Sequence, residues 1–162
     1  MSNKSVDEIC GDLMLIAPLE GNCLTISVAL AEALNNEGHR CCVVLGSLLC
    51  NGSTVFRFEA LPSSIDIDLK TNWGGHAWVR MLDDELVIDL TVYSTAFAAP
   101  RNSNLRRTIV TAGAPRPPQR VRAYNGLSGP LEYKEVERLD ANSELYVGVL
   151  KGFLSQIDSP TN

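Results

Sequence analysis

The sequence predicts an α+β fold in which an N-terminal helix packs on an antiparallel β-sheet. Apolar residues recur with helical spacing between residues 23 and 37. Short apolar runs follow, and two-residue turn signals connect them. Because the helix comes first and tight turns join the later strands, we expect neighbouring strands to pair antiparallel and to cover that helix.

The length and composition are typical of one domain. The chain has 162 residues, of which 45% are hydrophobic and 20% charged. We therefore expect residues 1–162 to form a single domain with its core at 18–93. The N-terminus lacks the basic and apolar regions of a secretory signal peptide, and no apolar run is long enough to span a membrane. These features predict a cytoplasmic protein, and export as an effector without a cleavable signal peptide stays open.

Two helices are expected before the first strand. A short helix is predicted over residues 5–16. The second helix, over 23–37, has the clearest pattern, with Asn22 as its N-cap and Gly38 as the residue that closes it. Its apolar stripe consists of Ile26, Ala29, Leu30, Ala33 and Leu34.

The strands are predicted as two hairpins. In the first, residues 41–49 and 55–61 flank the turn signal Asn51-Gly52. In the second, residues 76–82 and 86–92 flank Asp83-Asp84. A two-residue turn there pairs Leu82 with Glu85 and sets the register of the hairpin.

The second half of the chain has weaker patterns. Residues 94–130 are rich in Ser, Asn, Arg, Gly and Pro and are expected to be largely loop, with a short strand near 108–111. One or two helical turns are expected over 132–139, and a C-terminal helix over 142–157.

The five cysteines predict neither a disulfide framework nor a metal site. Their number is odd, and Cys41 and Cys42 are adjacent, which suits a reducing compartment. The chain contains no C-x-x-C motif and only two histidines, so a four-ligand zinc site is not expected. No cofactor is implied.

Cys23 is the candidate nucleophile. Backbone N–H groups and the helix dipole favour a thiolate at the start of a helix, where Cys23 lies. Cys41 and Cys42 lie instead in an apolar strand, where burial raises the pKa of a thiol.

His76 and Asp89 are the candidate base and orienting carboxylate. The expected hairpin register places His76 opposite Thr91, so Asp89 is its diagonal neighbour on the same face. A slip of one residue would move Asp89 to the opposite face. A carboxylate beside the base would fix its tautomer and stabilise the imidazolium.

The strings GNCLTISVALAEALNNEGHRCCVVLGSLL and GGHAWVRMLDDELVIDLT resemble the nucleophile and histidine segments of the transglutaminase-like superfamily. The resemblance covers about residues 21–91. It implies a papain/transglutaminase-like fold and a triad of Cys23, His76 and Asp89. The backbone N–H of Cys23 would supply one oxyanion donor, and Asn22, Trp73 and Trp78 are candidates for oxyanion or substrate support.

Three function classes follow from these residues. The first is a cysteine hydrolase, either a protease or a protein deamidase, acting on a peptide or protein substrate through a Cys23 thioester. The second is transfer to an amine by a transglutaminase or an acetyltransferase. The third is an inert binding module that contacts an anionic partner, with nucleic acid and membrane not expected. Its basic segment contains Arg101, Arg106, Arg107, Arg116, Arg120 and Arg122.

Overall fold

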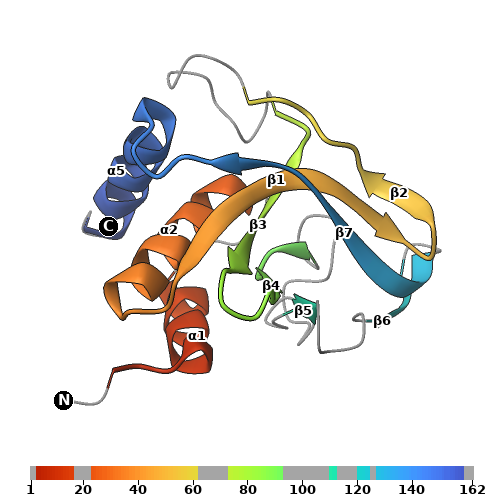
Figure 1. Ribbon diagram of the computed structural model, residues 1–162, viewed down its shortest axis with the longest axis horizontal. Coiled ribbons are helices and arrows are strands. Elements are labelled where there is room, and N and C mark those ends of the chain that lie inside the picture. The colour runs from red at the N-terminus through yellow and green to blue at the C-terminus, as the bar shows by residue number, and fades with distance from the viewer. Residues whose placement is uncertain are drawn as a thin grey trace.

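The fold is α+β, with helices on one side of an antiparallel sheet (Figure 1). The structure is a computed structural model that describes residues 3–16, 23–61, 73–92, 110–112, 120–124 and 127–158. For 110–112, 120–124 and residue 127 it describes the backbone alone. Figure 1 shows the three labelled helices grouped together while the sheet curls away from them. They are α1 (Val6–Ile16), α2 (Cys23–Asn36) and α5 (Glu144–Asp158).

The sheet is built around its central strand, β1 (Cys41–Cys50). The strand order is β5-β4-β3-β1-β7-β6, and β2 also pairs with β1. One edge of β1 pairs with β7, while β3 and β2 follow each other along the other edge. The remaining strands are β2 (Ser53–Phe56), β3 (His76–Met81), β4 (Val87–Asp89), β5 (Val110–Ala112), β6 (Arg120–Tyr124) and β7 (Leu127–Leu139).

Helix α2 forms as predicted and lies at the centre of the core. It contacts α1, α5, β1 and β3, so it is buried on several sides. Gly38 closes it with a φ of 87°, and the amide of His39 donates to the carbonyl of Leu34 in the pattern of a Schellman motif. Buried Val43, Leu45 and Val79 face the helices.

The first predicted hairpin turn is present, and the second hairpin has the predicted register but a wider turn between Met81 and Val87, with Glu85 at a φ of 58°. Asn51 and Gly52 have φ values of 49° and 81°, as a type I′ turn between β1 and β2 requires. In the second hairpin, Val79 pairs with Ile88 and Arg80 with Val87, which is the predicted register. Strand β2 is shorter than predicted and ends at Phe56.

The prediction for the second half of the chain needs two corrections. The helical turns expected over 132–139 are wrong, because this segment belongs to the long strand β7. The short strand expected near 108–111 is confirmed as β5, whereas residues 120–124 and 127–130 form strands rather than the expected loop; the rest of 94–130 lies outside the described residues. The C-terminal helix is confirmed, since α5 begins after Ser143, whose hydroxyl caps the amide of Tyr146.

Gly46 of β1 leaves space for the Trp78 ring on the curled face of the sheet. Gly46 pairs with His76 of β3 and with Glu135 of β7. A Cβ atom there would meet the carbonyl oxygen of Lys134 and would lie 2.7 Å from the Trp78 ring. The absence of a side chain therefore permits both the approach of β7 and the position of Trp78.

Within the described part of the chain, no helix is both long enough and apolar enough to cross a bilayer.

We predict that Gly46→Ala destabilises the protein by about 1–3 kcal/mol or more, because the added methyl group overpacks the space between β7 and Trp78. Urea unfolding measures the change. The matched control is Gly11→Ala in α1, where no atom lies within 4 Å of the added Cβ. This control should gain roughly 0.5–1 kcal/mol from helix propensity. Equal stability of wild type and Gly46→Ala would contradict the packing argument.

Candidate active site

Cys23 is the first residue of α2 and lies beside the start of β3. Its side chain is nearly buried, with 9% of the residue exposed. The thiol points to the carbonyl oxygen of Gly75, with an Sγ–O distance of 3.8 Å. Gly75 immediately precedes His76, so the first turn of α2 and the first residue of β3 meet here. The helix N-terminus favours negative charge at this position.

His76 and Asp89 are in direct contact. The Nε2 atom of His76 lies 2.6 Å from Oδ2 of Asp89, and both side chains are almost completely buried. The contact follows from the β3–β4 register, which makes Asp89 the diagonal neighbour of His76 on one face of the hairpin.

The Asp89 carboxylate accepts hydrogen bonds at both oxygens. Oδ2 accepts from His76 and from the hydroxyl of Tyr133, at 2.9 Å. Oδ1 accepts from the amide of Thr91 at 3.0 Å and from its hydroxyl at 3.3 Å. Burial raises the pKa of Asp89, but His76 and these donors outweigh burial and lower that pKa below its usual value. Asp89 is therefore a buried, ionised and fully hydrogen-bonded carboxylate.

The charge of Asp89 controls the protonation of His76. Burial alone lowers the pKa of His76, but the charge and hydrogen bond of Asp89 and the interaction with the Cys23 thiol raise that pKa to about 10. The imidazolium is thus the favoured form at neutral pH.

One ring nitrogen of His76 is not bound to Asp89. Because Nε2 faces Asp89, the ring presents Nδ1 on its other side. Nδ1 is buried and finds no backbone, nitrogen or oxygen partner in the part of the chain that the structure describes, whereas the Cys23 thiol interacts with the ring. The Cys23 thiol is close enough to raise the pKa of the ring.

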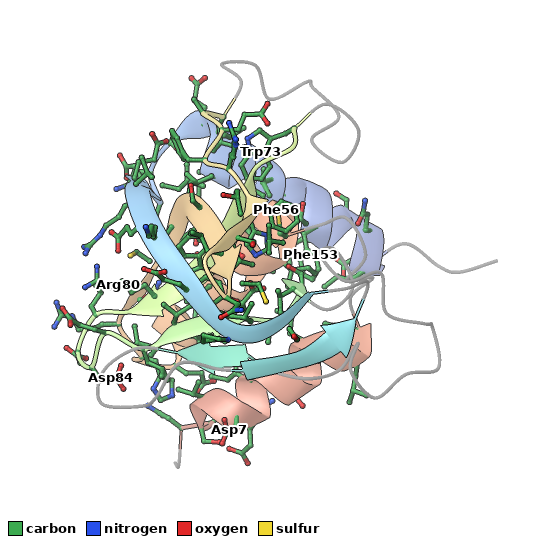
Figure 2. The ribbon with its side chains drawn as sticks, turned by 90° about the vertical axis from the view of Figure 1, so that its right-hand side faces the viewer. Asp7, Phe56, Trp73, Arg80, Asp84 and Phe153 are labelled. Carbon is green, nitrogen blue, oxygen red and sulfur yellow. The ribbon has the colours of Figure 1, made fainter. Side chains whose placement is uncertain are left out.

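Aromatic rings enclose the imidazole. Phe56 stacks on His76 with ring centroids 4.6 Å apart and an interplanar angle of 8°. Trp78 lies at 6.0 Å from the imidazole and meets Tyr133 edge-on at 5.0 Å. The rings of Phe56, Trp78 and Tyr133 keep water from the His76–Asp89 bond. Figure 2 shows Phe56 and Trp73 at one end of the sheet and Arg80, near Asp84, at the other.

The structure places the other candidate residues as follows. Trp73 packs over Gly75 and donates from Nε1 to the carbonyl of Glu59 at 3.1 Å, so its indole N–H is engaged within the chain. Trp78 is buried in the sheet face and touches the imidazole. Asn22 lies outside the described residues. Of the basic segment, Arg120 and Arg122 lie in β6 with only their backbone described, and Arg101, Arg106, Arg107 and Arg116 lie outside the described residues.

Three residues of the site were missed by the sequence analysis. Thr91 had a recognisable signal, because an Asp commonly accepts from the backbone two residues later. Tyr133 had a weaker one, the alternation Leu-Glu-Tyr-Lys at 131–134, which is typical of a strand. Phe56 had none, because its contact with His76 depends on the position of β2 along β1.

The other cysteines differ from Cys23 in their surroundings. Burial raises the pKa of Cys10 and of Cys41 to about 12 in each case. Burial also raises the pKa of Cys42 and of Cys50. The predicted effect of burial on Cys41 and Cys42 is confirmed. All five thiols are free.

Comparisons with models of protein families, with curated proteins and with solved structures find no match for this chain. Among the described residues, no group of three or more His, Cys, Asp or Glu side chains is placed to hold a metal ion.

We predict that Asp89→Asn lowers stability by roughly 3–5 kcal/mol near pH 6, because it leaves the buried imidazolium without its counter-charge. The folded pKa of His76, about 10, lies above its unfolded value of about 6.5. The stabilisation is therefore complete below pH 6.5 and is lost as pH rises toward 10. Urea unfolding across this range should show the two proteins converging.

The control for this prediction is Asp84→Asn, which makes the same chemical change in an exposed turn of the same hairpin. Its difference from wild type should not depend on pH in this window. A stability gap between wild type and Asp89→Asn that stays constant up to pH 10 would mean that the ion pair is absent.

Proposed function

We propose that the protein is a thiol-dependent acyl-transfer enzyme that hydrolyses an amide through a thioester on Cys23. One observation carries the proposal: a buried imidazole is bound through Nε2 to a buried carboxylate, while its Nδ1 finds no backbone, nitrogen or oxygen partner in the described structure and the Cys23 thiol interacts with the ring. A purely structural histidine would be expected to satisfy both nitrogens.

Each residue has a distinct task in the proposed reaction. The reaction begins from a Cys23 thiolate beside the His76 imidazolium, whose Nδ1 carries a proton and whose Nε2 is bound to Asp89. The thiolate attacks the amide carbonyl, and collapse of the tetrahedral intermediate breaks the C–N bond. The departing nitrogen receives the proton from Nδ1. Water, deprotonated by the now neutral His76, then attacks the thioester, and cleavage of the C–S bond releases the acid and restores the thiolate–imidazolium pair.

The resemblance to the papain/transglutaminase-like superfamily supports this assignment. The nucleophile begins a helix that packs on an antiparallel sheet, and the base and carboxylate follow in that order on adjacent strands. The N–H groups at the start of α2 are suited to a developing oxyanion. The proposed substrate is a peptide bond or a glutamine side-chain amide of a protein. Transfer to an amine uses the same steps, with the amine in place of water.

The first test is the rate of iodoacetamide alkylation at each cysteine, mapped by peptide mass analysis across pH. An ordinary thiol with a pKa of about 8.5 is only about 1% thiolate at pH 6.5. At pH 6.5 we expect Cys23 to be alkylated at least about tenfold faster than such an ordinary thiol. The His76→Ala substitution should reduce the alkylation rate of Cys23 to that of an ordinary thiol. Cys10 and Cys41, whose pKa values are about 12, are the internal references and should stay slow.

If Cys23 proves to be activated, the second test is the reaction with amide substrates. Incubation with peptides that contain internal glutamine separates the reactions, because proteolysis creates new termini, deamidation converts the amide to an acid, and an added amine becomes attached in transamidation. Cys23→Ala is the control. An unreactive Cys23 at every pH, in a protein that is folded, would overturn the proposal.

A further inference from the structure

The hydroxyl group of Tyr133 joins strands that are not neighbours in the sheet. Tyr133 lies on β7 and Asp89 on β4, with β3 and β1 between them. In a flat sheet three strand spacings of about 4.8 Å would separate them by roughly 14 Å. The bond of 2.9 Å forms because the sheet curls, which also brings β5 into contact with β7. Figure 1 shows β7 arching over the face that carries β4.

The position of the Tyr133 ring is fixed from two sides. Tyr133 pairs with Leu48 of β1, and its ring meets the Trp78 indole edge-on at an interplanar angle of 71°. Trp78 can reach that far because Gly46 leaves the space above β1 open. A phenol held in this way has little freedom to rotate, so its hydroxyl group stays directed at Oδ2 of Asp89.

That oxygen is the one that orients the imidazole. Oδ2 of Asp89 accepts from both Tyr133 and His76, while Oδ1 is occupied by Thr91. The groups that face Asp89 are thus His76 from β3, Tyr133 from β7 and Thr91 from β4, with no charged group other than His76 in contact among the described residues. The nearby Arg80 is paired with Glu85 and Glu135.

We propose that Tyr133 is a positioning residue for the Cys23 site: its hydroxyl group fixes the Asp89 carboxylate and so directs the His76 imidazolium toward the thiol. This inference rests on the proposed function. Without the hydroxyl group, Oδ2 keeps His76 as its one remaining donor in this shell and draws the imidazolium proton more strongly toward itself. This change weakens the positive charge that the imidazolium presents to Sγ, so thiolate formation moves to higher pH.

The test is Tyr133→Phe, which keeps the ring against Trp78 and removes only the hydroxyl group. The readout is the pH profile of Cys23 alkylation in the full chain. We expect its acid limb to move up by about one pH unit and the rate at pH 6 to fall about tenfold, the size typical of one hydrogen bond to a charged group. A merely structural tyrosine would lower the unfolding temperature without moving this profile.

Tyr146→Phe is the matched control. It removes another tyrosine hydroxyl, which lies 3.3 Å from Glu32 and 3.5 Å from the carbonyl of Val28, and it should leave the profile unchanged. In an Asp89→Asn background, Tyr133→Phe should shift nothing further, because Tyr133 acts through that carboxylate. If Tyr133→Phe does not fold, replacement of Tyr133 by 3-fluorotyrosine strengthens the donor and should move the acid limb to lower pH.

The outcomes separate the two proposals. If Cys23 is unreactive in the wild type, the proposed function fails, whatever Tyr133 does. If Cys23 is activated in the wild type and the profile of folded Tyr133→Phe, or of the fluorotyrosine protein, equals that of wild type, the role of Tyr133 is overturned and the proposed function stands.

Discussion

The buried, ionised carboxylate of Asp89, the last residue of β4, is the constraint on which the rest of the site depends. A buried charge costs several kcal/mol unless a counter-charge and donors surround it. Here the counter-charge comes from β3 through His76, and further donors come from β4 through Thr91 and from β7 through Tyr133. Three strands must therefore meet around one side chain, and this requirement couples the curl of the sheet to the protonation of the imidazole.

The aromatic residues make this arrangement possible. Phe56, Trp78 and Tyr133 surround the pair and exclude water, which strengthens the electrostatic attraction between His76 and Asp89. Gly46 makes room for the Trp78 indole because it has no side chain. Cys23, which packs in the core on the helix side, is only 9% exposed. In the proposed reaction a substrate would therefore have to reach a nearly buried thiol.

Much of the fold could be predicted from local sequence patterns. The helical spacing of 23–37 and the Asn51-Gly52 turn were visible because each depends on residues close in sequence. The His76–Asp89 contact was predictable for the same reason, since a short turn fixes the register of a hairpin. Strand β7 was not predicted. Its alternation breaks at a bulge, where Gly46 pairs with Glu135 and Leu45 with Glu137, so Val136 is left out of register and exposed.

The sequence by itself determined the position of Cys23 at the start of a helix and the shared face of His76 and Asp89. Both follow from backbone periodicity, which acts over a few residues. Only the tertiary structure decided that Tyr133 completes the shell of Asp89, that Phe56 covers the imidazole and that Nδ1 finds no backbone, nitrogen or oxygen partner among the described residues. Those contacts join segments up to 44 residues apart. They depend on how far the sheet curls, which is set by the packing of all its strands together.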